Sequence, residues 1–248
     1  MSNTKVRYPA GEQFIDNNKD ALVRSVQEIV RFPSVEAPAA GPGAPFGEAV
    51  RGALENALNL GKSFGFETTN LDGYAGCIDY GCGEEMLGVV AHVDVVPEGE
   101  GWIHPPYAAE IADGRIYGRG TMDDKGPAVC AIYALAAIKA AGIPMRRRVR
   151  IILGTNEETG WGCMDHYRKV AEIPTLTFSP DADYPVVNSE KGIYHATMRC
   201  NAKTNIRING GTRANVVCGK VKADSRECSV KDSAWKTARF LISLRLQP

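Results

Sequence analysis

The stretch Leu87–Asp94, with the sequence LGVVAHVD, leads an apolar run directly into a histidine and an aspartate. A short apolar run of this kind is typical of a buried strand. Because residues two apart on an extended chain point to the same side, His92 and Asp94 fall together at the end of this strand. His92 can therefore bind a metal ion while Asp94 accepts the second ring N–H and fixes the tautomer.

Two other apolar runs end in acidic residues in the same way. Val149–Leu153 leads into Glu157 and Glu158, and Thr175–Phe178 leads into Asp181. In an open α/β sheet the functional crevice lies outside the carboxyl ends of the strands. We therefore expect these acidic side chains and His92 to converge at one edge of the sheet.

A further acidic pair, Asp123 and Asp124, precedes the apolar run Ala128–Ala141. Several carboxylates buried together are costly unless a cation compensates them. Carboxylate and imidazole ligands suit Zn²⁺ or a similar divalent ion, with Mn²⁺ and Co²⁺ as alternatives. The adjacent residues Glu157 and Glu158 suggest that one carboxylate binds the metal and the other acts as a general base on water.

Taken singly, each of these motifs has an ordinary explanation. Histidine and aspartate occur two apart by chance, Glu-Glu pairs are usually solvated surface, and the Asp123-Asp124 pair could merely favour a helix N-terminus. All of the motifs together, placed at strand ends and helix starts, favour a metal centre. The remaining histidines, His104, His166 and His195, are expected to be structural or exposed.

The pattern of apolar residues around these motifs predicts the fold class. Helical spacing is present in 22–30 and 50–58, and Ala128–Ala141 is apolar on every face except Lys139, which predicts a buried helix. A short helix is predicted near 163–170, and short strands are predicted at 66–71, 76–80, 87–90, 149–153, 175–178 and 186–188. Apolar strands that alternate with helices indicate an α/β fold with a mainly parallel sheet flanked by helices.

Composition and charge exclude several classes of protein. The 248 residues include 29 Lys and Arg and 29 Asp and Glu, and this zero net charge argues against nucleic-acid binding. No apolar run approaches the roughly 20 residues of a membrane span, and Met1–Asp20 is unlike a secretory signal. Seven cysteines without a CxxC pair indicate reduced thiols and a cytoplasmic protein. The oligomeric state is left open.

Longer motifs around these residues resemble the zinc aminopeptidase, carboxypeptidase and aminoacylase superfamily, and within it the PepV-type bacterial dipeptidases. The motifs are GVVAHVDVVPEGEGW (88–102), IYGRGTMDDKGP (116–127), GTNEETGWGCMDHY (154–167) and SPDADYPVVNSEKG (179–192). The resemblance extends through GGTRANVV (210–217) and covers roughly residues 10–217. It implies the N-terminal part of a zinc-peptidase catalytic domain, followed by the start of an α+β lid domain.

The resemblance implies a ligand set for two zinc ions. His92 and Asp181 would hold one ion, and Asp123 would bridge it to a second ion that Glu158 would also bind. A cis peptide bond between Asp123 and Asp124 is implied as well.

The resemblance also implies catalytic roles and an activity. Glu157 would be the general base that takes a proton from the bridging water, and Asp94 would orient His92. The activity would be metal-dependent hydrolysis of dipeptides, with a small peptide as the binding partner. The alternatives are a desuccinylase-like deacylase of N-acyl amino acids and an inactive metal-binding remnant.

The last part of the chain departs from the family pattern. Residues 218–248 carry seven Lys and Arg against three Asp and Glu, and this net charge of +4 offsets −4 in residues 1–217. In the family the catalytic domain resumes after the lid and supplies a last histidine ligand, whereas no histidine follows His195 here.

We therefore expect three segments in this chain. Residues 1–190 form the catalytic part, 191–217 begin the lid, and 218–248 are an atypical tail that suggests a frameshift or truncation. A chain that lacks the last ligand should bind about one zinc ion tightly and hydrolyse dipeptides poorly, because the loss of even an indirect metal contact costs tenfold or more in affinity or activity.

Overall fold

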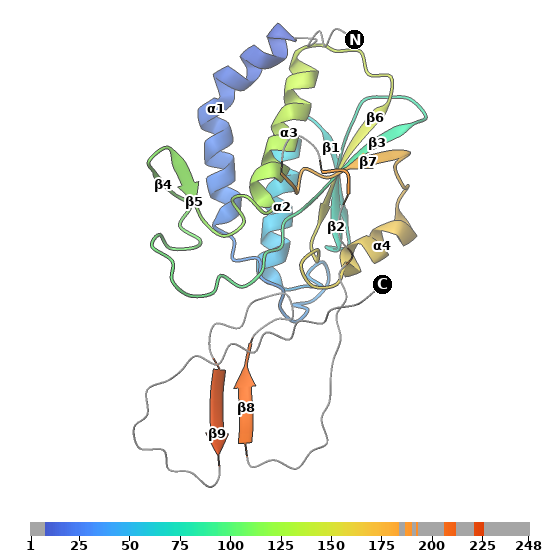
Figure 1. Ribbon diagram of the computed structural model, residues 1–248. Helices are drawn as coiled ribbons and strands as arrows, with labels where there is room; N and C mark the ends of the chain where they lie inside the picture. Colours follow the sequence, from blue (N-terminus) through green and yellow to red (C-terminus); the bar gives the residue numbers. More distant parts are fainter. Residues whose placement is uncertain (1–7, 184–186, 190–191, 193–205, 212–220, 226–248) are drawn as a thin grey trace. The chain divides into compact units, whose positions relative to one another are not determined.

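The computed structural model describes residues 8–183, 187–189, 192, 206–211 and 221–225. The chain divides into two compact units, Met1–Val187 and Asn188–Pro248. Every residue of the predicted site lies in the first unit. Figure 1 shows this unit as a sheet with helices packed on it.

The predicted helices are present in the first unit. They are α1 (Pro9–Val30), α2 (Glu48–Ser63), α3 (Lys125–Ala140) and α4 (Gly162–Val170). The helix α1 ends just before the segment that leads into Pro33, because the residue preceding a proline is pushed out of the helical region. It begins much earlier than its apolar spacing indicates, with Pro9 in its first turn, where a proline is tolerated.

The central sheet has five strands in the order β1-β2-β6-β3-β7. β3 pairs in parallel with both β6 and β7, whereas β2 pairs antiparallel with both β1 and β6. Within this sheet β2 therefore runs against the other four strands, and the predicted mainly parallel sheet is confirmed. The strands are β1 (Glu67–Leu71), β2 (Ala75–Tyr80), β3 (Met86–His92), β6 (Arg148–Gly154) and β7 (Leu176–Phe178).

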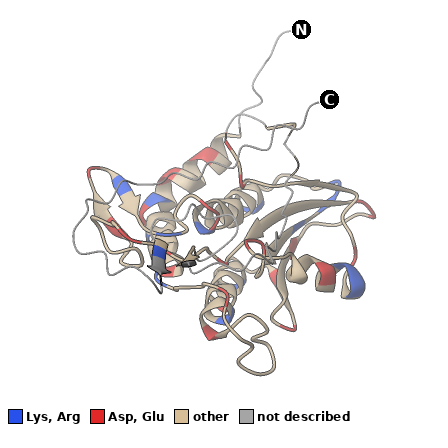
Figure 2. Ribbon diagram, turned by 60° about the horizontal axis from the view of Figure 1, so that its bottom comes forward, with Lys and Arg blue, Asp and Glu red and all other residues tan. Residues whose placement is uncertain are grey.

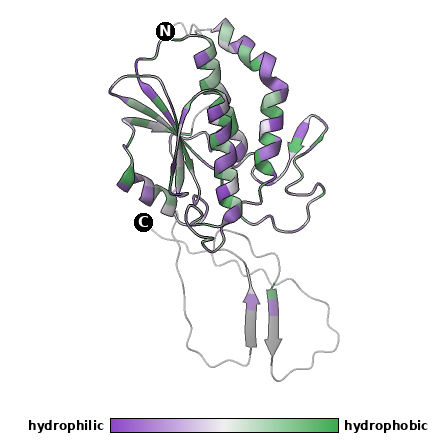
Figure 3. Ribbon diagram, turned by 180° about the vertical axis from the view of Figure 1, so that it is seen from behind, coloured by the Kyte–Doolittle hydropathy of each residue, from purple (hydrophilic) through white to green (hydrophobic). Residues whose placement is uncertain are grey.

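Helices cover both faces of this sheet, as Figure 1 shows. α2 and α3 pack on one face, α1 packs against α3, and α4 packs on the other face against β2. The central strands β3 and β6 carry apolar runs, and α1 alternates hydrophobic and hydrophilic residues (Figure 3). The core between the helices and the sheet includes the fully buried side chains of Ile29, Leu54, Ile78, Ile132 and Leu153.

The helix α3 is less completely buried than its sequence predicts. Most of its residues face the core, but Cys130, Ala134 and Ala140 are exposed. These residues are small, so their exposure leaves little apolar surface in water. Lys139, the one charged residue of the predicted run, donates hydrogen bonds to the carbonyl groups of Phe64 (2.7 Å) and Gly65 (3.0 Å).

A short hairpin, β4 (Glu110–Ala112) and β5 (Arg115–Tyr117), was not predicted from the sequence. Its two turn residues are Asp113 and Gly114, with φ of 49° and 72°. An Asp-Gly pair is a strong local signal for a two-residue hairpin turn, because both positions need positive φ. The strands themselves are too short for alternation to reveal them.

The second unit contains one two-stranded antiparallel sheet within its described residues. It pairs β8 (Ile206–Gly210) with β9 (Val221–Ser225). The strand predicted near 186–188 is not formed at Val187 or Asn188, and residue 186 lies outside the described residues. The segment boundaries at 190 and 217 stay predictions.

The described residues carry charge of both signs along the ribbon. Asp165 is followed by Arg168 and Lys169 on α4, and Figure 2 shows acidic and basic residues interspersed in the same manner elsewhere. No helix among the described residues has the length and apolar character needed to cross a membrane.

Candidate metal centre

The carboxyl ends of β3, β6 and β7 lie side by side in the sheet. His92, the last residue of β3, pairs with Gly154 at the end of β6, and Val89 pairs with Phe178 at the end of β7. The parallel arrangement therefore brings the segments that follow these strands to one edge. This edge is the crevice that the strand order predicts.

Three carboxylates converge on one ring nitrogen of His92. Its Nε2 atom lies 3.0 Å from Asp123 Oδ1, 3.4 Å from Asp181 Oδ2 and 4.0 Å from Glu157 Oε2. The His92 side chain is only 2% exposed, whereas that of Asp123 is 59% exposed. The site therefore has a buried nitrogen at its base and carboxylates that reach it from the solvent side.

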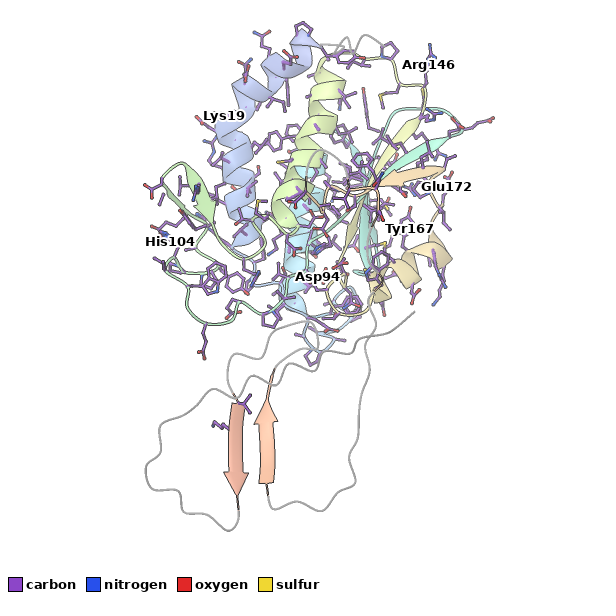
Figure 4. All side chains as sticks on the ribbon, in the orientation of Figure 1. Lys19, Asp94, His104, Arg146, Tyr167 and Glu172 are labelled. Carbon is purple, nitrogen blue, oxygen red and sulfur yellow. The ribbon has the colours of Figure 1, made fainter. Side chains whose placement is uncertain are left out.

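The other ring nitrogen of His92 is held by Asp94, labelled in Figure 4. His92 Nδ1 lies 2.9 Å from the main-chain carbonyl oxygen of Asp94 and 3.4 Å from its carboxylate Oδ1. The sequence predicts a bond to the carboxylate, but the closer partner is the carbonyl. Either acceptor leaves Nε2 unprotonated and free to bind a metal when Nδ1 carries the proton.

The Asp94 carboxylate is engaged elsewhere. Its two oxygens accept hydrogen bonds from the main-chain N–H groups of Glu157 and Glu158, each at 3.1 Å. Because Asp94 is 1% exposed, this carboxylate fixes the start of the loop that follows β6. It thereby sets the position of both glutamates relative to His92.

Asp123 and Asp124 have different roles in the structure. The peptide bond between them is cis, as the resemblance implies. Asp124 is fully buried as the N-cap residue of α3, and its Oδ2 atom accepts a hydrogen bond from the main-chain N–H of His92 at 3.0 Å. Asp124 therefore ties α3 to the end of β3 and leaves Asp123 to face His92 Nε2.

The segment that follows β3 is hydrogen-bonded to the segment that follows α1. Ser34 donates its hydroxyl hydrogen to the Val93 carbonyl at 2.6 Å, and the Val95 N–H donates to the Ser34 carbonyl at 3.0 Å. The fully buried Lys125 donates from Nζ to the Phe32 carbonyl at 2.6 Å. The two Ser34 bonds hold the backbone on either side of Asp94, and the Lys125 bond holds the segment that leads to Ser34.

The electrostatics of the site favour a cation. Burial alone would lower the pKa of His92, but hydrogen bonds to Asp123, Asp181 and Asp94 outweigh it and raise the pKa well above its usual value. The hydrogen bond from His92 lowers the pKa of Asp123. The cluster thus attracts positive charge to the position that His92 Nε2 faces.

The two glutamates after β6 are shifted in the opposite direction. Burial raises the pKa of Glu157, and burial together with the negative charge of Asp123 raises the pKa of Glu158 to about 7. A carboxylate with a raised pKa accepts a proton from water more readily near neutral pH. Both residues could therefore transfer a proton, or could be held in the ionised form by a cation nearby.

The donor set fits a divalent metal ion. One nitrogen of His92 and one oxygen each of Asp123 and Asp181 lie within 4.8 Å of one another, which is the spacing at which a single ion can be held. Imidazole and carboxylate oxygen are the ligands found at zinc sites. Glu158 does not belong to this close group of three ligands. Asp94 and Glu157 also lie outside the group, but each has an oxygen near a ring nitrogen of His92.

The other histidines within the described residues have local partners. His104 Nδ1 lies 3.0 Å from Glu110 Oε2 beside the β4–β5 hairpin, where Figure 4 labels it, and its ring stacks on Tyr117. His166 Nε2 lies 3.0 Å from Asp72 Oδ2. These contacts agree with the expectation of structural roles, which stays a prediction, and His195 lies outside the described residues.

Sequence reasoning missed several residues that shape the site. Ser34, Lys125 and Trp161 all contact its backbone or side chains, yet no periodicity or spacing distinguishes them. Lys125 and Trp161 lie inside the motifs DDKG and ETGWG, and only that proximity could have pointed to them.

The fold and the site define an α/β protein with a candidate metal centre at the carboxyl ends of its strands. Residues 88–240 match the family described as peptidase family M20/M25/M40. The match covers more than half of the chain, and the chain belongs to this family.

Curated relatives extend the similarity over most of this chain. A putative dipeptidase YtjP of Bacillus subtilis (strain 168) is 47% identical over 208 residues, which are 80% of this chain and 45% of the relative. The Beta-Ala-Xaa dipeptidase of Lactobacillus delbrueckii subsp. lactis is 39% identical over 214 residues, which are 86% of this chain and 44% of the relative. The chain therefore spans less than half the length of these relatives.

Solved structures share the fold at lower identity. Human carnosine dipeptidase 1 superposes with a TM-score of 0.56 at 23% identity, over 66% of this chain and 38% of that chain. The M20 family metallo-carboxypeptidase Sso-CP2 from Sulfolobus solfataricus gives a TM-score of 0.54 at 18% identity, over 65% and 37%. The first unit thus has the fold of part of these peptidases.

Proposed function

We propose that this chain is part of a metal-dependent hydrolase of dipeptides. The observation that carries the proposal is the convergence of Asp123, Asp181 and Glu157 on His92 Nε2. Relatives that are named as dipeptidases support the choice of substrate class. The described geometry supports a hydrolytic role because it combines a candidate ion site with the Glu157 carboxylate beside it.

His92, Asp123 and Asp181 would hold the metal ion, for which zinc is the preferred candidate and Mn²⁺ or Co²⁺ are alternatives. When bound, the ion would polarise the scissile carbonyl and lower the pKa of a water molecule. The proposed general base is Glu157, and this role is supported by the 4.0 Å between its Oε2 atom and His92 Nε2 and by burial, which raises its pKa. It would take a proton from water and pass it to the leaving amine.

A second zinc ion would involve Asp123 and Glu158. Among the described residues, the closely spaced ligand group contains His92, Asp123 and Asp181 but not Glu158. We therefore propose that one ion binds tightly and a second binds weakly. Turnover by this chain should be slow, with kcat below the range of roughly 1–10³ s⁻¹ typical of enzymes.

Zinc content and hydrolysis of the purified 248-residue chain test this proposal. We expect about one tightly bound zinc per chain and slow, zinc-dependent hydrolysis of free dipeptides. His92→Asn should abolish both, whereas His166→Asn, which removes an imidazole outside the site, should change neither. Absence of tight zinc binding would contradict the metal centre, and faster hydrolysis of N-acyl amino acids than of dipeptides would contradict the substrate class.

We also propose a cytoplasmic location, with small peptides rather than nucleic acid as binding partners. The four described cysteines, Cys77, Cys82, Cys130 and Cys163, are free thiols, which supports a reducing compartment. Fractionation of cells that produce the chain, followed by detection in the cytosolic fraction, checks the location.

A further inference from the structure

Trp161 contacts the proposed general base. The indole Nε1–H of Trp161 donates a hydrogen bond to Glu157 Oε1 at 3.2 Å. Both residues lie in the loop between β6 and α4, four positions apart. Trp161 is 55% exposed, so burial in the core does not explain where this side chain lies.

The backbone of Trp161 adopts a conformation that favours glycine. Its φ of 61° and ψ of 20° place it in the left-handed region, which is uncommon and strained for a bulky residue. Gly160 and Gly162 flank Trp161 in the sequence. The residue with the strained backbone is nevertheless the tryptophan, although a glycine at this position would relieve the strain. A side chain kept at a strained position points to a role for that side chain.

The main chain of Trp161 is held firmly. Its N–H donates to the Asn156 carbonyl at 2.8 Å, and its carbonyl accepts from the N–H groups of Met164 and Asp165, each at 3.0 Å. The indole is therefore presented from a fixed backbone. A hydrogen bond from such a group can restrict the side chain that accepts it.

Apart from the Trp161 bond and an approach to His92, the described residues give Glu157 a hydrogen bond at its main-chain N–H. Its N–H bonds to Asp94, and its Oε2 atom faces His92 Nε2 at 4.0 Å. A glutamate has several accessible rotamers, so a contact that selects one of them works against a loss of conformational entropy. A bond to Oε1 selects the orientation in which Oε2 faces the site.

We propose that Trp161 is a positioning residue that holds the Glu157 carboxylate toward the metal centre. The catalytic consequence rests on the proposed function, in which Glu157 is the general base. The hydrogen bond itself can be measured without any turnover.

The first experiment records the indole N–H resonances of the zinc-loaded chain by NMR. The chain has three tryptophans, and Trp161→Phe identifies the resonance of Trp161. We expect Glu157→Ala to shift this resonance upfield and to speed its exchange with water. The Trp102 indole, which donates to the Glu98 carbonyl at 2.8 Å, serves as the internal reference and should not move. An unchanged Trp161 resonance would overturn the proposal.

The second experiment compares dipeptide hydrolysis by Trp161→Phe, Trp161→Gly and Trp102→Phe. The two Trp161 variants should lower kcat by roughly 10- to 100-fold with KM changed less than twofold, because a misplaced catalytic group loses rate rather than binding. Trp161→Gly relieves the backbone strain and should remain folded, so its loss of rate is not a loss of structure. Trp102→Phe should match the parent chain.

The two experiments separate the two proposals. A parent chain without dipeptide hydrolysis contradicts the proposed function, while the NMR resonance still decides whether Trp161 holds Glu157. A shifted resonance combined with an unchanged kcat in both Trp161 variants would overturn the positioning role.

Discussion

The carboxylate of Asp94 accepts a hydrogen bond from the main-chain N–H of Glu157 at 3.1 Å. This bond joins the segment after β3 to the segment after β6, and the neighbouring N–H of Glu158 adds a second bond of equal length. One buried side chain thus sets the distance between His92 and the two glutamates. The link explains how residues more than 60 positions apart form one site.

Asp94→Asn should damage this link, although it preserves the shape of the side chain. An amide NH₂ cannot accept from an N–H group, so one buried donor loses its partner, at a cost of about 1–3 kcal/mol of unfolding free energy. Zinc affinity should fall about 10- to 100-fold, because Asp94 also orients His92. Urea unfolding and zinc titration measure the two effects.

The same chemical change at Asp113 provides the control for this prediction. Asp113 is an exposed turn residue with positive φ, a conformation that asparagine tolerates well. Asp113→Asn should leave stability and zinc affinity unchanged. Equal effects of the two variants would show that Asp94 has no special role.

Gly126→Ala should destabilise the start of α3. A Cβ atom at this position would lie 2.0 Å from the main-chain oxygen of Thr121, and backbone cannot move as easily as a flexible side chain. We expect a loss of about 1–3 kcal/mol or more in the free energy of unfolding, with weaker zinc binding because Asp123 is displaced. Chemical denaturation provides the measurement.

Gly11→Ala is the matched control, since Gly11 lies in α1 and its added Cβ would be 3.5 Å from the nearest atom, an ordinary contact. Alanine is the better helix former, so this variant should gain about 0.5–1 kcal/mol. If Gly126→Ala were as stable as the parent, the tight packing of the α3 start would be refuted.

Lys125 should make the stability of the metal-free chain depend on pH. Burial lowers the pKa of Lys125 to about 7, although the charge of Asp94 acts in the opposite direction, whereas the unfolded chain retains the ordinary value of 10.5. Between these values the unfolded state binds a proton that the folded state does not, so stability rises with pH, by at most about 1.4 kcal/mol per unit. Below pH 7 both states are protonated and this contribution is flat.

Lys125→Met isolates this contribution, because it keeps an unbranched side chain that is one atom shorter and removes the titrating group. Unfolding free energies of both chains are measured with a chelator present. The value for the parent minus the value for the variant should increase between pH 7 and 9. Parallel curves over that range would argue against a depressed pKa for Lys125.

The parts of the fold that were predicted correctly are those with strong local patterns. The strands around 87–90 and 149–153 are apolar and largely buried, and these strands and 175–178 are followed by acidic residues. The rule for carboxyl ends of parallel strands then brings His92, Glu157 and Asp181 to one edge, whereas Asp123 reaches that edge from the segment before α3. The hairpin at 110–117 escaped notice because its strands have three residues each. Periodicity needs more residues than that to be visible.

The finer contacts of the site depend on tertiary placement. The sequence indicates that Asp94 serves His92, but only the folded chain shows that its carboxylate binds the Glu157 and Glu158 main chain while its carbonyl faces His92 Nδ1. The hydrogen bond of Trp161 likewise depends on a left-handed turn that a tryptophan does not predict. Such contacts follow from backbone geometry, which residue types alone do not determine.

The edge strand β7 should promote self-association. Among the described residues it pairs with β3 alone, and Leu176 and Phe178 are 57% and 53% exposed. An exposed apolar edge offers free backbone groups and hydrophobic surface to another chain. Leu176→Lys should raise the concentration at which light scattering begins several-fold, with a change in unfolding free energy within about 0.5 kcal/mol. Ile103→Lys places the same charge at a 93% exposed loop position, away from any strand edge. Ile103→Lys should raise the concentration at which scattering begins much less. An equal rise in both variants would show that the added charge, and not the β7 edge, controls self-association.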